Sequence, residues 1–157
     1  MRETKEALDW IVELLRKNKI PFEITGGLAS RIYGSKRLLA DIDIEVPDKS
    51  LPKVQQLTRR YIIYGPREYI DDNFDLPLMT LKYRGQVIDI CGKDSEKIFD
   101  KKKRKWISEK TNLSKANMKK IGDLIVPVVP MRDLISYKKE LGRNVDKKDV
   151  RELSKKD

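Results

Sequence analysis

Residues 41–46 alternate acidic and aliphatic side chains without interruption, in the order Asp-Ile-Asp-Ile-Glu-Val. Successive side chains of a β-strand point to opposite faces, so this pattern predicts a strand whose aliphatic face covers a hydrophobic core. Asp41 and Asp43 then lie on the other face, roughly 6–7 Å apart along the strand. Carboxylates placed in this way can bind hard divalent cations such as Mg²⁺. The alternative is a solvent-facing edge strand, of which Glu45 would also be part.

A third carboxylate, Asp89, interrupts the segment Val-Ile-Asp-Ile at residues 87–90, which is otherwise suited to burial. A buried carboxylate is costly unless it is paired or binds a metal. Asp89 therefore either joins Asp41 and Asp43 at a metal site or forms a salt bridge with a lysine or arginine. Two metal ions roughly 3.5–4 Å apart could stabilise both sides of a phosphoryl transfer. On this interpretation the three aspartates are the candidate catalytic and metal-binding residues.

Gly26 and Gly27 stand 14 residues before this predicted strand, between a short strand and a short helix. Glycine lets the backbone approach a ligand closely, and the N-terminus of a helix favours anions. We therefore expect a phosphate group beside these glycines, next to a metal held by Asp41 and Asp43. Taken alone, a glycine pair more often forms a simple turn.

The remaining pattern alternates helices with strands. Apolar spacing predicts helices over residues 3–18, 28–33, 50–61, 131–141 and from a cap at Asp146 to about 153. Strands are predicted over residues 22–24, 41–46, 78–83, 86–91 and 123–129, with a hairpin turn at Arg84-Gly85. Residues 92–120 are polar and give no clear prediction. The order predicts an α+β (α/β) fold: a small mixed sheet flanked by helices, with a C-terminal helical tail. All 157 residues are expected to form a single domain, with a core over about 1–125 and a helical segment over about 126–157.

The composition excludes several kinds of chemistry. The chain has no histidine, which removes Ser-His-Asp and Cys-His catalysis and histidine zinc sites. Its single cysteine, Cys91, excludes an internal disulfide and a multi-cysteine zinc site. The apolar runs are too short for a membrane helix, and the N-terminal residues do not resemble a secretory signal. We therefore expect a cytoplasmic protein without a membrane partner, whose chemistry uses carboxylates, lysine, tyrosine or a hard metal ion.

The positive charge is concentrated in the last third of the chain. Residues 1–100 hold 17 Lys/Arg and 17 Asp/Glu, whereas residues 101–157 hold 18 Lys/Arg and 8 Asp/Glu and so carry the whole net charge of +10. Five consecutive basic residues, 101–105, begin that segment. Such a block favours a polyanionic partner, either nucleic acid or nucleotide phosphates. A solvated loop is the alternative.

Two groups of residues carry a resemblance to a known family. Thr-Gly-Gly-Leu-Ala at 25–29 and Arg-Leu-Leu-Ala-Asp-Ile-Asp at 37–43 resemble the signature of the nucleotidyltransferase fold of the DNA polymerase beta superfamily. They are similar to two small branches, the lincosamide-type antibiotic nucleotidyltransferases and the abortive-infection type IV toxin nucleotidyltransferases. Residues 130–138, Arg143 and the segment Lys-Asp-Val-Arg-Glu-Leu at 148–153 resemble the C-terminal helical motif of those branches.

The resemblance implies a metal-dependent enzyme that moves a nucleotidyl group from an NTP such as ATP to a hydroxyl acceptor and releases pyrophosphate. It implies that Asp41 and Asp43 hold Mg²⁺ or Mn²⁺, and that Asp89 binds one metal and activates the acceptor hydroxyl. The residues expected to bind the nucleotide are Gly26, Gly27, Arg37 and Lys138, while Arg143 and Asp149 are structural candidates.

The acceptor has more than one candidate. The basic last third favours RNA, because phosphates bind clustered lysine and arginine. The resemblance to the toxin branch of toxin-antitoxin systems implies, more specifically, modification of a tRNA or of a protein hydroxyl. A small, antibiotic-like molecule is the rival acceptor. A basic RNA-binding module without catalysis is the alternative of a different class, although three carboxylates facing a polyanion argue against it. A dimer is also expected, because so small a core leaves a nucleotide cleft open on one side.

Overall fold

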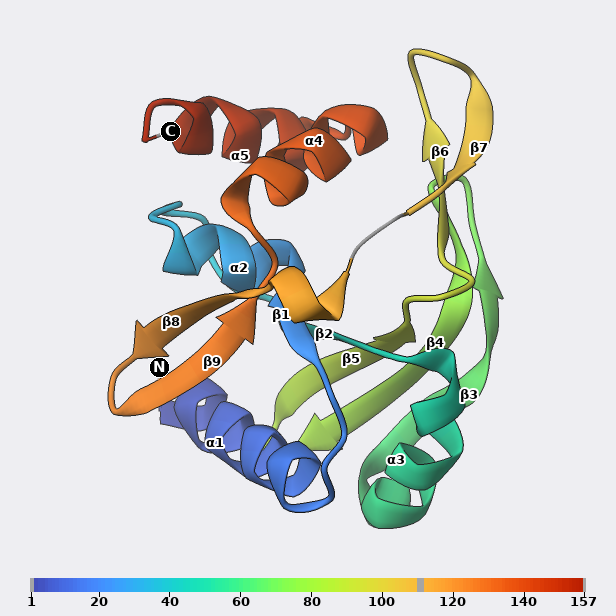
Figure 1. The fold of residues 1–157 in the computed structure, drawn as a ribbon, viewed down its shortest axis with the longest axis vertical. Helices are drawn as coiled ribbons and strands as arrows, with labels where there is room; N and C mark the ends of the chain where they lie inside the picture. The colour runs from blue at the N-terminus through green and yellow to red at the C-terminus, as the bar shows by residue number, and fades with distance from the viewer. Residues whose placement is uncertain (1, 110–111, 157) are drawn as a thin grey trace.

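Helices and strands alternate along the chain in the computed structural model, which describes residues 2–109 and 112–156 (Figure 1). The α-helices are α1 (Arg2–Lys17), α2 (Gly26–Ile32), α3 (Leu51–Thr58), α4 (Met131–Leu141) and α5 (Asn144–Ser154). The strands are β1 (Glu23–Thr25), β2 (Asp41–Val46), β3 (Ile62–Ile70), β4 (Phe74–Tyr83), β5 (Gln86–Gly92), β6 (Lys97–Asp100), β7 (Lys105–Ser108), β8 (Asn117–Ile121) and β9 (Leu124–Val128). The predicted mixture of helices and strands is confirmed.

The strands form one mixed sheet in the order β7-β6-β4-β5-β2-β1-β9-β8, with β3 paired to β4. β2 is parallel to β5 and antiparallel to β1, so it lies in the interior of the sheet. The alternative of an edge strand at residues 41–46 is therefore wrong. Within the described residues, no helix has the length and apolar character that a membrane span requires.

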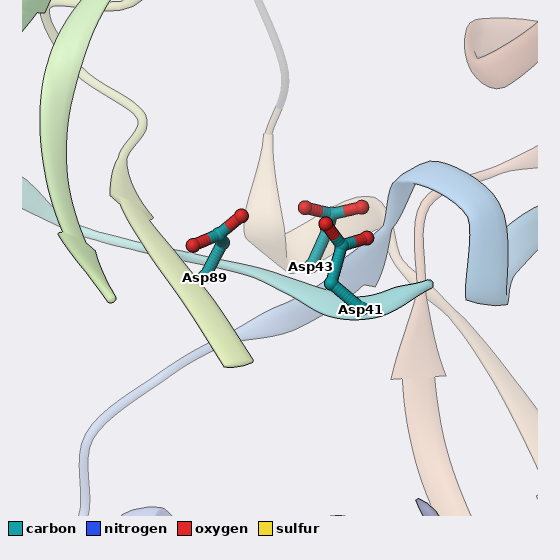
Figure 2. A group of neighbouring side chains, drawn as sticks. All are labelled: Asp41, Asp43 and Asp89. Atoms are coloured by element: carbon teal, nitrogen blue, oxygen red, sulfur yellow. The ribbon is translucent and has the colours of Figure 1, made fainter. Parts of the chain in front are cut away.

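The strand register aligns polar residues in one row across the sheet. Asp43 on β2 faces Asp89 on β5 and Thr25 on β1, and Thr80 on β4 faces Asp89. Asp41 lies two residues before Asp43 and therefore shares its face. Figure 2 shows the three aspartates, which lie far apart in the sequence, projecting from neighbouring strands.

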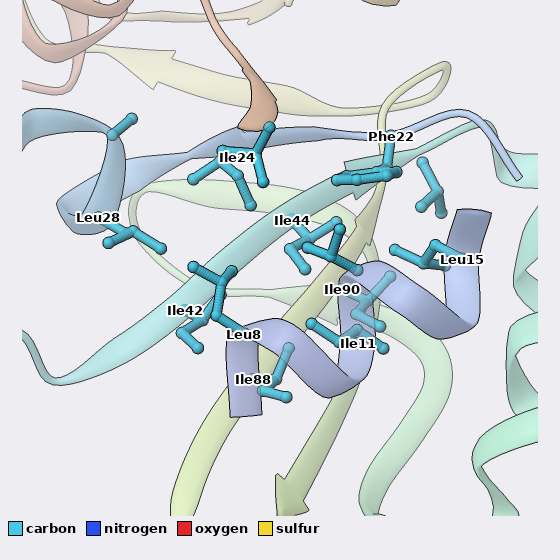
Figure 3. Packing of buried hydrophobic residues seen from close by; sticks show 14 of the residues in the cluster. Leu8, Ile11, Leu15, Phe22, Ile24, Leu28, Ile42, Ile44, Ile88 and Ile90 are labelled. Atoms are coloured by element: carbon cyan, nitrogen blue, oxygen red, sulfur yellow. The ribbon is translucent and has the colours of Figure 1, made fainter. Parts of the chain in front are cut away.

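The opposite face of β2 and β5 is aliphatic and packs against α1. Ile42 and Ile44 on β2 and Ile88 and Ile90 on β5 are fully buried. Leu8, Ile11 and Leu15 recur at helical spacing on α1 and close this layer (Figure 3). The alternation of residues 41–46 therefore places the isoleucines of β2 in the hydrophobic core and its aspartates in the polar row.

Helices α2, α4 and α5 lie on the polar side of the sheet (Figure 1). In Figure 1, α1 and α3 lie below the central strands, and α2, α4 and α5 lie above them. α4 ends at Gly142, whose φ of 61° is a left-handed conformation that glycine adopts without strain. α5 begins at Asn144, two residues before the predicted cap. Asp146 instead occupies the third helical position and accepts a hydrogen bond from the Arg143 backbone N–H at 3.1 Å, as in a capping box.

Four strands fall where the sequence pattern predicts none. β3 contains Gly65-Pro66, where its register with β4 shifts, and proline is rare within strands. β6 and β7 have four residues each, and the basic residues 101–104 form the turn between them. β8, at residues 117–121, also lies in the segment without a prediction. Two further residues of that segment, 110 and 111, lie outside the described residues.

Candidate active site

The aspartate triad, which consists of Asp41, Asp43 and Asp89, brings its carboxylates together on the polar side of the sheet (Figure 2). One carboxylate oxygen from each lies within 4.8 Å of the others, and all three side chains are half-buried. Two come from one strand and the third from its parallel neighbour, in register. The sheet pairing is therefore what assembles the triad.

The triad concentrates negative charge. Burial first, and then the charges of Asp41 and Asp89, raise the pKa of Asp43 to about 7, although the Gly27 backbone N–H and the charge of Lys138 act to lower it. Hard oxygen donors that repel one another in this way are suited to a divalent cation such as Mg²⁺, which would relieve the repulsion. The donor set therefore fits the metal that the sequence pattern predicts.

Asp89 does not take the salt bridge that is its alternative role. Among the described residues, no lysine or arginine forms an ion pair with it. Its partner is the Thr80 hydroxyl, which donates to Asp89 Oδ1 at 2.6 Å. Burial raises the pKa of Asp89, the Thr80 hydrogen bond lowers it, and the charge of Asp41 raises it. The result is a carboxyl group that is oriented by a neutral donor and has an elevated pKa.

The glycine pair is built around Asp43. Gly26 and Gly27 are the first two residues of α2, and Gly26 has a φ of 62°. A Cβ atom at Gly26 would collide with the Asp43 carboxylate, and the Gly27 backbone N–H donates a hydrogen bond to Asp43. The two motifs that the sequence separates therefore form one packed unit.

All seven sequence-predicted site residues line a single cavity of about 600 Å³. They are the three aspartates together with Gly26, Gly27, Arg37 and Lys138. The cavity extends from the triad toward β3, β4 and α4, so its walls come from segments that are far apart in the sequence.

Further residues line the cavity besides these seven. Tyr64 and Tyr69 line it from β3. That strand itself was not predicted, so no sequence signal placed them. Thr80 was identifiable, because the Arg84-Gly85 turn pairs Tyr83 with Gln86 and hence, three residues along each strand, Thr80 with Asp89.

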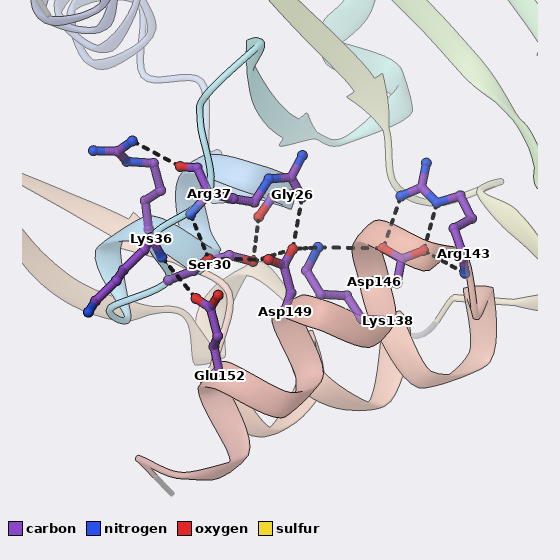
Figure 4. A network of polar contacts seen from close by, with 11 residues as sticks. Gly26, Ser30, Lys36, Arg37, Lys138, Arg143, Asp146, Asp149 and Glu152 are labelled. Atoms are coloured by element: carbon purple, nitrogen blue, oxygen red, sulfur yellow. Dashed lines mark hydrogen bonds and ion pairs between the residues drawn. The ribbon is translucent and has the colours of Figure 1, made fainter.

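The two predicted phosphate-binding cations are held by a buried carboxylate (Figure 4). Arg37 Nη1 lies 2.8 Å from Asp149 Oδ2, and Lys138 Nζ lies 2.9 Å from the same oxygen. The Lys138 side chain is only 2% exposed and also lies 3.6 Å from Asp146, whereas the Arg37 side chain is 21% exposed. Only Arg37 therefore presents an appreciable surface to the cavity.

A second acidic group lies beside the triad. Glu45, assigned above to a possible solvent-facing strand, is buried and lines the cavity together with Glu96. Burial and the neighbouring Glu45 raise the pKa of Glu96 well above its usual value. Burial, again with Glu45, raises the pKa of Glu23 to about 9. Glu23 and Glu96 therefore favour their protonated form in the folded chain.

Comparison with solved structures identifies the fold of the chain, whereas comparison of sequences finds no match. No family model matches the sequence, and no curated protein sequence matches it either. Among solved structures, TM1012 of Thermotoga maritima, a candidate nucleotidyltransferase, superposes with a TM-score of 0.76 at 17% identity, covering 99% of this chain and 95% of that one. The lincosamide antibiotic adenylyltransferase LnuA, solved with lincomycin bound, gives 0.63 at 16% identity over 97% of each chain. ANT(2")-Ia, in complex with adenylyl-2"-tobramycin, gives 0.63 at 13% identity, covering 96% of this chain and 87% of that one.

The chain therefore has the nucleotidyltransferase fold. The predicted resemblance is thereby confirmed at the level of the fold.

Proposed function

We propose that this chain is a metal-dependent nucleotidyltransferase that transfers a nucleotidyl group from an NTP to a hydroxyl acceptor and releases pyrophosphate. The observation that carries the proposal is the aspartate triad, with carboxylate oxygens within 4.8 Å of one another in a cavity that also contains Gly26 and Gly27. A purely structural carboxylate cluster would be expected to have cationic partners. The nucleotidyltransferase fold is consistent with this activity.

The residues have distinct roles in the proposal. Asp41, Asp43 and Asp89 would hold Mg²⁺ or Mn²⁺, which when bound neutralises charge on the phosphates. Gly26 and Gly27, whose missing side chains make room for Asp43 and Arg37, would border the triphosphate in the cavity that they line. Among the predicted cations, Arg37 would contact the phosphates, while the buried Lys138 would contribute through its charge.

The chemical step is an in-line displacement at phosphorus. The acceptor hydroxyl oxygen forms a bond to the α-phosphorus, and the bond from that phosphorus to the bridging oxygen of the β-phosphate breaks. Pyrophosphate leaves with the electron pair. Thr80 occupies Oδ1 of Asp89, so we assign the acceptor proton to Oδ2 of that residue. The elevated pKa of Asp89 suits it to accept that proton.

Two acceptor classes have separate support. The exposed basic turn of residues 101–104 lies beside the end of α4: the Lys101 backbone N–H donates to the Glu140 carbonyl, and Arg143, just after that helix, lines the cavity. This position favours RNA or tRNA as the acceptor, because clustered lysine and arginine side chains bind the backbone phosphates. A small hydroxylated acceptor is favoured by the cavity volume of about 600 Å³ and by the ligands of LnuA and ANT(2")-Ia.

The proposal is tested by label transfer. The protein is incubated with each α-labelled NTP and Mg²⁺ or Mn²⁺, in turn with total RNA, purified tRNA, a protein extract and a panel of small hydroxylated molecules. The doubly substituted Asp41→Asn/Asp43→Asn protein is the control. We expect label on one acceptor class from the wild-type chain and none from the control.

Thermal stability separates the enzyme from a non-catalytic RNA-binding module. The enzyme should be stabilised by NTP together with Mg²⁺, and the substituted protein should lose this gain. A binding module should instead be stabilised by RNA alone, with steep salt dependence and no requirement for the metal. Absence of both label transfer and metal-dependent NTP binding would overturn the proposal.

A further inference from the structure

Asp149 lies at the centre of a buried polar network behind the cavity (Figure 4). Its side chain, on α5, is fully buried. Besides the two cations, the hydroxyls of Ser30 and Ser35 donate to it at 3.4 and 3.2 Å. We refer to Asp149 with Ser30, Ser35, Arg37 and Lys138 as the Asp149 network. It joins α2, the loop that precedes β2, α4 and α5.

The network is electrostatically satisfied. Burial alone would raise the pKa of Asp149, but the hydrogen bonds and charges of Lys138 and Arg37 outweigh burial and lower it. A buried carboxylate with two cations and two hydroxyl donors is held in one place. The same contacts fix the positions of the cations.

Arg37 is the more exposed of the two network residues that line the cavity. Its guanidinium lies against Gly27, where a Cβ atom would come 3.2 Å from Arg37 Cζ and 3.3 Å from Nη2. Nη1 is the atom that binds Asp149, so the guanidinium is anchored at one end and borders the triad side of the cavity at the other. An arginine has five N–H donors in a rigid planar group, so one contact to Asp149 leaves donors for a phosphate.

We propose that Asp149 is a positioning residue for the nucleotide, which holds the Arg37 guanidinium beside Gly27 so that it meets the triphosphate without prior rearrangement. The inference rests on the proposed function. Preorganisation lowers the entropic cost of binding, so its loss should weaken NTP binding more than it slows the chemical step.

Asp146 supplies a matched comparison within the same helix. It is also fully buried on α5 and lies 3.6 Å from Lys138, but its remaining bonds go to Arg143. Among the described residues, Arg37 forms its ion pair with Asp149 and not with Asp146. Substitution of either aspartate disturbs a buried ion pair, whereas only one substitution releases Arg37.

The test measures KM for the NTP and kcat separately in the label-transfer reaction. Since a hydrogen bond to a charged group is worth enough to change binding about tenfold, Asp149→Asn should raise KM about tenfold or more and change kcat less than about threefold. Asp146→Asn should change KM less than about threefold, even where it lowers the melting temperature as much. Equal effects of the two substitutions on KM would overturn the proposal.

A double-substitution cycle excludes a merely structural effect. If Asp149 acts through Arg37, then Asp149→Asn should change KM less than about twofold in a protein that already carries Arg37→Gln. Independent, multiplying effects would overturn the proposal. Should Asp149→Asn not fold, Ser35→Ala serves instead, because Ser35 Oγ donates to Asp149 and accepts from the Arg37 backbone N–H. We expect it to raise KM about threefold, and an unchanged KM would overturn the proposal.

The wild-type chain distinguishes the two possible failures. If it shows no metal-dependent binding or use of any NTP, the proposed function fails and this inference with it. If it is active and Asp149→Asn leaves KM unchanged, the inference alone fails.

Discussion

The aspartate triad and the Asp149 network line or support the same cavity, yet they balance their charges differently. In the triad, three carboxylates face one another, and burial and mutual repulsion raise the pKa of Asp43 to about 7. In the network, one carboxylate is shared by two cations, which lower its pKa. The triad has no ion-pair partner among the described residues, and a bound cation could supply the missing positive charge. The Asp149 network already contains its positive charges, on Lys138 and Arg37. Removal of an acid should therefore have opposite effects on stability in the two places.

The largest expected effect is the loss of activity in Asp43→Asn. We expect label transfer to fall at least about a hundredfold, because a preorganised charged group of the site is lost. Without metal at pH 8, the same change should raise the free energy of unfolding, because it relieves repulsion with Asp41 and Asp89. Activity and urea denaturation measure the two effects. Asp72→Asn, at an exposed position outside the cavity, is the matched control. Retained activity in Asp43→Asn would contradict the assignment of the triad.

The opposite result is expected in the network. Asp149→Ala should lower the free energy of unfolding by roughly 3–5 kcal/mol, because it leaves buried Lys138 without its nearest partner. Urea denaturation at pH 7 measures this, with Glu152→Gln on the same helix as control. A loss below about 1 kcal/mol would mean that the network contributes no more than a surface ion pair.

A smaller effect is expected on how the free energy of unfolding changes with pH, through the buried carboxyl group of Glu23. Below 4.5, Glu23 is protonated in both states; as the pH rises toward 9, the unfolded chain releases this proton while the folded chain keeps it. Stability from this group is therefore present at low pH and lost between about 5 and 9. Glu109, whose pKa is raised to about 8 by burial first and then by Glu140, acts in the same direction. Glu23→Gln should be stabilised relative to the wild-type chain by about 1 kcal/mol or more at pH 8, and by little at pH 4.5. An equal gain at both pH values would contradict this origin.

The smallest effect is expected at the basic turn between β6 and β7. Lys102 and Lys103 are exposed, and only their backbone N–H groups bind Asp100, so Lys102→Ala/Lys103→Ala should change the free energy of unfolding by less than about 0.5 kcal/mol. If RNA is the acceptor, its binding should lose about 0.7 of log–log salt slope for each phosphate contact removed. An unchanged slope would exclude this turn from RNA binding.

The same contrast explains what the sequence could predict. The triad depends on strand alternation and on a two-residue hairpin turn, which are local patterns, and all its members were identified. The seven predicted site residues line one cavity, although their roles stay predictions. The edge strand that carries Tyr64 and Tyr69 was missed, because Gly65-Pro66 contradicts strand propensity at the bulge.

The network was harder to predict, because it depends on long-range packing. Arg37 and Asp149 are 112 residues apart, and no local pattern relates them. Lys138 was expected to help bind the nucleotide, while its burial between two carboxylates is set by how α4 packs on α5. Glu45 was linked to solvent for a similar reason: alternation gives the face of a strand but not what covers that face.

The contact between Gly26 and Asp43 determines which substitutions at positions 26 and 43 can occur together. Any side chain at position 26 would occupy the space of the carboxylate, and the φ of 62° disfavours most residues there independently. Variation at position 26 should therefore be tolerated only in chains whose residue 43 has already become smaller, and such chains would have lost a carboxylate of the triad. In a library randomised at both positions and selected for activity, the glycine and the aspartate should be recovered together. Under selection for folding alone, other residues at position 26 should be recovered together with a smaller residue at position 43.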